Sequence, residues 1–232
     1  MSNQRYVSDE LTHFVGRSFN GGPEADEQQY ALLLDILKTG QLGASKEVRV
    51  TSDPSKAFSD NQYYKSNVVC FSDIPLADLT IHMAKYSRFG MAFKKSFLIE
   101  RGANPVFYVV KNSLAKLAHG KMEKRAEYFD RMHAAILELF ERMGDEWKSG
   151  AGEDYIKELL GFLVFHFFSF AKFYQEGLPP EHPENFYMER EWRIFGSLEF
   201  SLAEVTRIMF PKDFARRFRD DLPEFYGQIN FS

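Results

Sequence analysis

The chain has 232 residues and a formal net charge of −4. This acidic balance argues against a general nucleic-acid-binding protein, because domains of that class are normally basic. Hydrophobic residues make up 44% of the sequence, with 24 Phe and 11 Tyr, which is enough to build a sizeable core. We therefore expect a single domain over residues 1–232.

The cysteine content and the lengths of the apolar segments lead us to expect a cytoplasmic protein. The single cysteine, Cys70, excludes an internal disulfide and is expected to be a small core residue. No zinc-ligand spacing occurs, so we predict no metal site. The apolar stretch 159–174 is interrupted by His166, and its uncharged part ends before Lys172. That part is shorter than the roughly 20 residues that a membrane-spanning helix needs. It favours a buried core helix, and the N-terminus has no apolar signal segment.

The first half of the chain alternates short apolar runs with turn residues. Gly40 is expected to end a helix that has acidic residues in its first turn. Gly90 is expected to end a short helix that lies between two strands. In chain order the expected elements are a strand at 11–16, a helix at 24–39, a short strand at 48–50, a strand at 68–71, a helix from 75 to 90, and strands at 91–93 and 105–110.

The second half groups its helices together before strands return. Helical periodicity covers residues 114–143 and 154–174, which predicts a long helical hairpin insertion over residues 113–176. Strands at 192–195, 205–210 and 228–231 follow, with a short helix at 211–221 between the last two. Strands at both ends with helices grouped between them predict an α+β fold with a mixed, mainly antiparallel sheet.

Asp78, His82 and Tyr86 share one side of the predicted helix 75–90. Their i, i+4, i+8 spacing places the three side chains along one line. An acid, an imidazole and a phenol in a row suit the wall of a pocket, and they equally suit a hydrogen-bonded helix face.

Two glutamates stand just ahead of the late strand at 192–195. Glu189 and Glu191 are two positions apart, which places both carboxylates on one face. Like charges this close raise one pKa unless cations separate them, and Arg190 and Arg193 are the expected partners. The pair is either a charge ladder on an edge strand or a site. In a site, one acid would orient a ribose hydroxyl and stabilise an oxocarbenium-like centre.

Two further candidates lie on or after the first strand. His13 is either a hydrogen-bonded strand histidine or a reactive group, and Arg17 either binds a phosphate or pairs with an acid. No Gly-rich phosphate loop, nucleophile elbow or HExxH sequence occurs.

Ordered blocks of the sequence resemble one bacterial family. The AbiGi family comprises abortive-infection phage-resistance proteins that form the antitoxin half of a two-gene system. The resemblance implies a co-encoded toxin as the partner; it leaves the oligomeric state open. The blocks are SDELTHFVGR (8–17), ILKTGQL (36–42), VCFSDIPL (69–76), HMAKYSRFGMAFKKSFL (82–98), GANPVFYV (102–109) and EREWRIF (189–195).

The order of motifs is also similar to that of ADP-ribosyltransferases, whose core runs from an early Arg or His through a middle Ser or Tyr to a late Glu-x-Glu. This resemblance implies an ADP-ribosyltransferase-like fold and NAD as a possible ligand. It assigns His13 to the nicotinamide-ribose position, Tyr86 or Ser72 to the middle position, and Glu189 and Glu191 to the acidic pair. The residues it implies around the ligand are Phe14, Arg17, Ser72, His82 and Arg193.

Three functions therefore stand open. A phage-defence antitoxin predicts an exposed apolar or charged surface, expected on the helical hairpin. An NAD-dependent ADP-ribosyltransferase-like enzyme, acting on protein or nucleic acid, predicts that His13, Tyr86 and Glu191 converge in one concave site. An inactive transferase fold kept as a binding module is the third.

Overall fold

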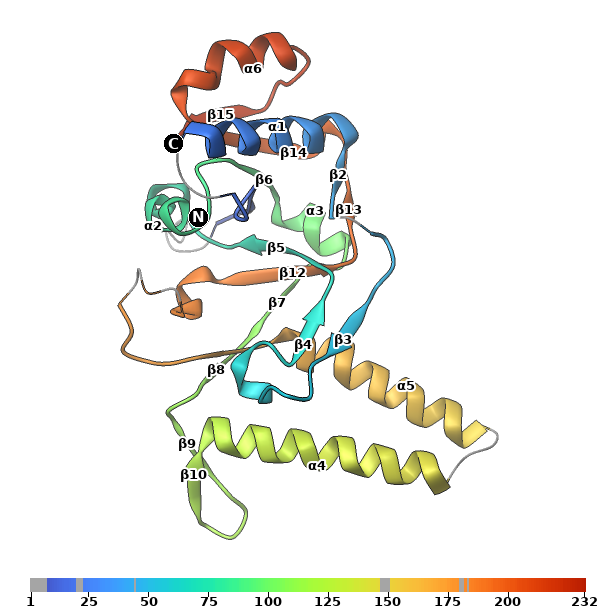
Figure 1. Cartoon of the computed structure of the whole chain (residues 1–232). Coiled ribbons are helices and arrows are strands. Elements are labelled where there is room, and N and C mark those ends of the chain that lie inside the picture. Colours follow the sequence, from blue (N-terminus) through green and yellow to red (C-terminus); the bar gives the residue numbers. More distant parts are fainter. Residues whose placement is uncertain (1–7, 20–22, 44, 147–150, 180–181, 183) are drawn as a thin grey trace, which may run out of the picture. The chain divides into compact units, whose positions relative to one another are not determined.

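The computed structural model describes residues 8–19, 23–43, 45–146, 151–179, 182 and 184–232 (Figure 1). Its contacts divide the chain into two compact units. The first consists of Met1–Val48, Val68–Pro105 and Met188–Ser232, and the second of Arg49–Asn67 and Val106–Tyr187. Within the described residues, no helix is both long and apolar enough to cross a membrane.

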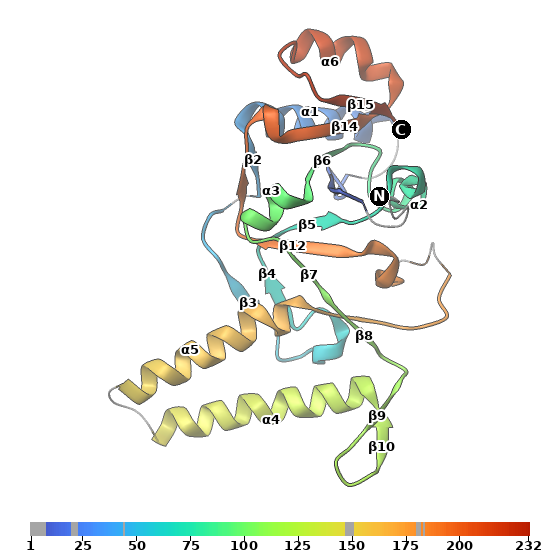
Figure 2. The same ribbon diagram turned by 180° about the vertical axis from the view of Figure 1, so that it is seen from behind.

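A seven-stranded sheet forms the centre of the first unit. Its strand order is β15-β14-β6-β1-β5-β12-β7, and the β14–β15 pair is parallel while the other neighbours are antiparallel. Figure 2 shows β5 and β12 side by side. The predicted α+β fold with a mixed, mainly antiparallel sheet is confirmed. The strands are β1 Glu10–Phe14, β5 Val68–Ser72, β6 Gly90–Lys94, β7 Asn104–Pro105, β12 Glu191–Phe195, β14 Val205–Phe210 and β15 Gln228–Phe231.

The main core of this unit joins α1 to one face of the sheet. On α1 (Pro23–Thr39), Tyr30, Leu33 and Leu37 recur at helical spacing and are almost fully buried. They belong to the same apolar cluster as Leu11 and Phe71 of the sheet. The remaining elements are α2 Thr80–Lys85, α3 Lys95–Glu100, α6 Ala215–Asp221, and the ladder of β2 Gln41–Leu42 with β13 Leu198–Glu199.

Strand register assigns each residue of the sheet to one of two faces, because paired residues share a face and successive residues alternate. Leu11 and Phe71 define the face that packs into the main core, here called the core face. Thr12 pairs with Ser72, and Ser72 pairs with Glu191, so these three residues lie on the opposite face. We call it the α2 face, because the next residue of β1 on that face contacts the residues of α2, as described below.

The second unit contains small ladders and two long helices. Its helices are α4 Arg125–Glu146 and α5 Ala151–His166. Its core includes Tyr64, whose hydroxyl lies 2.7 Å from Nε2 of the buried His133, and the rings of Phe58 and Phe173. The ladders are β3 Val50–Ser52 with β4 Tyr64–Ser66, β8 Phe107–Val110 with β11 Ala171–Tyr174, and β9 Leu114–Lys116 with β10 Met122–Lys124.

Parts of the predicted helical insertion were wrong. Residues 114–124 form the β9–β10 hairpin rather than the start of a helix, since the turn closes at Gly120, which takes a φ of +84°. The predicted helix over 154–174 ends at His166, and residues 171–174 pair with β8 instead. In both places strand pairing overrides the helical period. The predicted strand 105–110 is likewise divided between β7 and β8.

Three local predictions also need correction. Cys70 is exposed, because its neighbours Val69 and Phe71 occupy the core face and Cys70 points the other way. The predicted helix 75–90 is shortened to the 3-10 turn η2 (Leu76–Asp78) and α2, so Asp78 is exposed and lies outside α2. The α5 helix is not a core helix, since several of its large apolar side chains are exposed.

Candidate functional site

Glu189 is held by two residues at the end of α2. It closes the 3-10 turn η4 (Phe186–Glu189), and its side chain is only 5% exposed. The Tyr86 hydroxyl donates a hydrogen bond to Glu189 Oε1. Lys85 Nζ donates to the same oxygen at 2.9 Å, and the Lys85 side chain is 12% exposed. A buried carboxylate therefore has a cation and a phenol as partners, which offsets the cost of removing its charge from water.

Glu191 has a cation of its own. It begins β12 with its side chain on the α2 face, and Arg193 Nε donates to Glu191 Oε1 at 2.7 Å. Both side chains are largely buried. The expected pairing of Glu191 with Arg193 is therefore present, whereas the cation beside Glu189 is Lys85, which the sequence did not single out. Each acid of the Glu-x-Glu motif therefore has a cation within hydrogen-bond distance.

The surroundings of Tyr86 keep its hydroxyl protonated. Burial is the largest cause of the raised pKa of Tyr86, followed by the negative charge of Glu189 and the hydrogen bond to it. Glu191 raises the pKa further, and Arg17 lowers it. The Tyr86 phenol can therefore act here as a hydrogen-bond donor and not as a base at neutral pH.

Phe14 connects the first strand to α2 through ring stacking. Its ring centroid lies 5.6 Å from that of Tyr86 and 6.4 Å from that of His82, with the planes nearly parallel. On the same phenol, Arg17 Cζ lies 4.7 Å from the ring centroid. Arg17 is exposed and forms no ion pair with any residue that the structure describes. An exposed cation thus stands beside an aromatic stack and two neutralised carboxylates.

His82 ties α2 to the turn that carries Glu189. Its Nε2 donates to the carbonyl of Met188 at 2.9 Å, while its Nδ1 is buried and has no hydrogen-bond partner among the described residues. Burial lowers the pKa of His82, against the opposing effects of the Met188 carbonyl and the Glu189 charge. The neutral ring with a proton on Nε2 is the form that these contacts select.

His13 lies on the other face of the sheet. It pairs with Met91 and alternates with Thr12, so it shares the core face with Leu11. Its Nδ1 donates to the Cys70 carbonyl at 2.8 Å, and its ring meets the edge of Phe71 at a centroid distance of 5.8 Å. Burial lowers the pKa of His13, and the bond to Cys70 partly opposes this.

The structure therefore brings together most of the predicted site residues and leaves one apart. Ser72 is buried on the α2 face and pairs in register with Glu191. The convergence of His13, Tyr86 and Glu191 that the enzyme function predicts is not met, because the His13 and Glu191 side chains leave opposite faces of the sheet. The residues on the α2 side, here called the carboxylate cluster, are Phe14, Arg17, Ser72, His82, Lys85, Tyr86, Glu189, Glu191 and Arg193.

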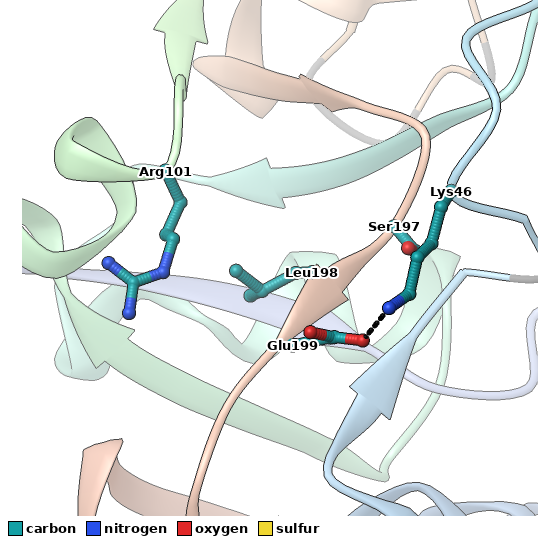
Figure 3. A pocket seen from close by; sticks show the side chains of 5 residues that line it. All are labelled: Lys46, Arg101, Ser197, Leu198 and Glu199. Carbon is teal, nitrogen blue, oxygen red and sulfur yellow. Dashed lines mark ion pairs between the residues drawn. The ribbon is translucent and has the colours of Figure 1, made fainter.

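Two hollows on the surface of the first unit lie away from the carboxylate cluster. One of about 280 Å³ is lined by the residues in Figure 3, where Lys46 forms an ion pair with Glu199 beside Ser197, Leu198 and Arg101. Another of about 440 Å³ is lined by residues 8–10 and 94–96. Neither includes a member of the carboxylate cluster. Within the part of the chain that is described, no group of three or more His, Cys, Asp or Glu side chains is placed to hold a metal ion.

Comparison with protein families gives a match over most of the chain. The family model described as "Putative abortive phage resistance protein AbiGi, antitoxin" matches residues 48–222. The chain belongs to the AbiGi family. The matched span contains the sequence blocks at 69–76, 82–98, 102–109 and 189–195, while those at 8–17 and 36–42 precede it. All of the cluster except Phe14 and Arg17 therefore lies within the AbiGi match.

Other comparisons add little to this assignment. No curated protein matches this AbiGi-family chain. Among solved structures, DarT of Thermus sp. 2.9 in complex with NAD+ is similar at 11% identity, over 100% of this chain and 98% of that one, with a TM-score of 0.38. A likeness at that level supports no conclusion about the fold or the activity of the AbiGi-family chain.

Proposed function

We propose that this chain is the antitoxin-type component of a two-gene phage-defence system and that it acts on a co-encoded toxin protein. Membership of the AbiGi family supports the proposal, since the family description names abortive phage resistance and an antitoxin. The structural observation that supports it is an apolar surface on α5.

The exposed large apolar side chains of α5 form one stripe. Tyr155, Leu159 and Phe162 are 62%, 37% and 48% exposed, and their spacing of four and three residues places them on one side of the helix. Phe167 continues the stripe, with its ring centroid 5.1 Å from that of Phe162. We call these four residues the α5 seam. Contiguous exposed apolar side chains of this kind mark sites of protein–protein contact, and a protein partner would bury them.

Co-expression tests this function. The product of the neighbouring gene is expressed alone, with the wild-type chain, and with Phe162→Glu, which places a charge in the α5 seam. Wild type is expected to restore growth, and Phe162→Glu is expected to fail although it is made at the same level. Tyr226→Glu is the matched control, because Tyr226 is 94% exposed and belongs to the first unit. Toxicity that persists with the wild-type chain rules the function out.

We propose a second candidate function as an alternative; it rests on the carboxylate cluster alone and does without His13, which lies on the opposite face of the sheet. It is an NAD-dependent ADP-ribosyltransferase-like enzyme acting on protein or nucleic acid. The observation that favours it is the convergence of Glu189, Glu191 and Tyr86 with the exposed Arg17 and the ring of Phe14. Carboxylates beside a glycosidic bond stabilise an oxocarbenium-like centre, and an unpaired guanidinium suits a phosphate.

The roles in such a reaction follow from these contacts. The bond between the ribose C1′ and nicotinamide breaks, and nicotinamide leaves with the bonding electrons. An oxygen or nitrogen nucleophile of the acceptor then bonds to C1′, and its proton passes to water. Glu191 would orient the ribose hydroxyls and stabilise the positive charge that develops at C1′. Phe14 would stack on the nicotinamide ring. Tyr86 can donate a hydrogen bond but cannot remove a proton, because its phenol stays protonated.

A thermal-shift titration with NAD tests the second candidate. Binding at a hundredfold excess over the dissociation constant adds about 2.7 kcal/mol to the free energy of unfolding. Wild type is expected to respond, Glu191→Gln to respond less, and His13→Gln to respond like wild type, since His13 lies on the core face. A flat response of the wild-type chain excludes this candidate and leaves the antitoxin function untouched.

A further inference from the structure

The residue between the two glutamates has an unusual backbone. Arg190 takes a φ of +44°, in the left-handed region where residues other than glycine are uncommon. Such a conformation persists only where the surrounding structure holds it. Arg190 separates η4, which ends at Glu189, from β12, which begins at Glu191. Its conformation therefore sets how the two carboxylates are presented relative to each other.

Asp73 contacts Arg190 through both its backbone and its side chain. The Asp73 backbone N–H donates to the Arg190 carbonyl at 3.1 Å, next to the register pair of Ser72 and Glu191. The Asp73 carboxylate oxygen Oδ2 lies 3.6 Å from Arg190 Nη2. Asp73 and Arg190 thus meet just beyond the ends of their strands, after β5 and before β12.

The Asp73 carboxylate is itself built into the unit. Its side chain is 8% exposed, and Oδ2 accepts a hydrogen bond from Lys95 Nζ at 2.9 Å. Lys95 also lies 5.5 Å from the ring centroid of Trp192, the residue after Glu191. The second oxygen, Oδ1, is buried and has no hydrogen-bond partner among the described residues. The two cations beside this buried carboxylate, Lys95 and Arg190, stabilise its negative charge.

We propose that Asp73 is a positioning residue that holds Arg190 in its left-handed conformation and thereby sets the positions of Glu189 and Glu191 within the carboxylate cluster. The meaning of this role rests on the second proposed function, in which the two carboxylates act on a ligand. The contact itself joins two segments that are far apart in the chain, the end of β5 and the start of β12.

The imidazole of His82 reports on this geometry without any ligand. Its Nε2 proton is held by the carbonyl of Met188, the residue before Glu189. If Asp73 positions the segment, Asp73→Asn releases η4, and His82 loses its single Nε2–H form. Glu10→Gln is the matched control, because Glu10 is a partly buried carboxylate paired with Arg207 at 2.9 Å elsewhere in the same unit.

The experiment records the imidazole nitrogen spectrum of the full chain at a pH where histidines are neutral, with His82 assigned from His82→Gln. Wild type and Glu10→Gln are expected to show the Nε2–H tautomer, and Asp73→Asn a mixture of both tautomers. An unchanged His82 pattern in folded Asp73→Asn overturns the proposal. A general loss of stability does not by itself change the tautomer in the folded state.

A second pair of variants covers the case in which Asp73→Asn does not fold. Arg190→Lys keeps a cation beside Asp73, whereas Arg190→Ala removes it, and both are residues that disfavour a positive φ. The lysine variant is expected to retain the wild-type tautomer and the alanine variant to lose it; identical spectra overturn the proposal. Titration with NAD is read separately. No response from wild type removes the second proposed function, while the His82 spectra still decide the role of Asp73.

Discussion

The Tyr86 hydroxyl donates a hydrogen bond to Glu189 across 103 positions of the chain. Lys85, the residue before Tyr86, contacts the same carboxylate oxygen. A helix as short as α2, Thr80–Lys85, is not stable alone in water. These contacts, with the bond from His82 to Met188, fix α2 against η4 and so assemble the carboxylate cluster.

The first prediction concerns the buried ion pair. Lys85→Met removes the ammonium group that donates to the Glu189 carboxylate, which is 5% exposed, and is expected to lower the free energy of unfolding by about 3 kcal/mol. Urea denaturation measures this. The control is Lys46→Met, whose partner Glu199 is exposed, so the loss there is below about 1 kcal/mol. Equal losses in the two variants would show that the Lys85 pair is not buried.

Removing one hydroxyl tests the tyrosine separately. Tyr86→Phe keeps the stack on Phe14 but takes a donor from the buried carboxylate of Glu189, at an expected cost of about 2 kcal/mol. Tyr226→Phe is the matched control, since Tyr226 is 94% exposed and its change is expected to cost nothing measurable. Denaturation curves that place both variants at the wild-type midpoint contradict the hydrogen bond.

The third prediction is a pH dependence. Burial lowers the pKa of His13 below its ordinary value of 6.5, so the unfolded chain binds a proton at a higher pH than the folded chain does. The stability from neutral His13 is complete above pH 6.5 and is lost as pH falls from there through the folded pKa. His13→Gln should therefore flatten the fall in unfolding free energy between pH ~7.5 and pH ~5.5. His82 and His133, whose pKa values are also lowered, retain the rest of the slope. A slope as steep as that of wild type contradicts the burial of His13.

A fourth prediction separates the backbone of Arg190 from its side chain. Glycine accepts a φ of +44° without strain and alanine does not, so Arg190→Gly should be more stable than Arg190→Ala by about 1 kcal/mol. In an ordinary strand the order is reversed. Chemical denaturation of the two proteins compares them directly, and an advantage for alanine would mean that the positive φ is absent.

Local signals in the sequence were enough to predict those helices and strands whose hydrophobic period and end residues agree with the structure around them. Strands 205–210 and 228–231 and helix α1 are of this kind. Residues 114–124 and 171–174 were predicted as helix because their period is ambiguous, and pairing partners far along the chain decide them. Nothing local to residues 171–174 indicates that β8 would pair with them.

The candidate site divides in the same way. The sequence singled out Glu189, Glu191 and Tyr86, but Glu189 lies in the 3-10 turn η4 and not on β12, so strand spacing does not decide its direction. Lys85 was missed because its partner lies 104 positions away. His13 could have been placed correctly, since strand alternation groups it with the apolar Leu11 and Val15, both buried. Asp73 carried no such signal, because its contact with Arg190 is tertiary.

The measurement that tests the central claim most directly is growth of cells that express the product of the neighbouring gene together with this chain. Wild type and Glu191→Gln are expected to restore growth, because the antitoxin function is assigned to the α5 seam and not to the carboxylate cluster. Phe162→Glu is expected to leave the cells inhibited. Continued inhibition in the presence of wild type, or full rescue by Phe162→Glu, would contradict the account.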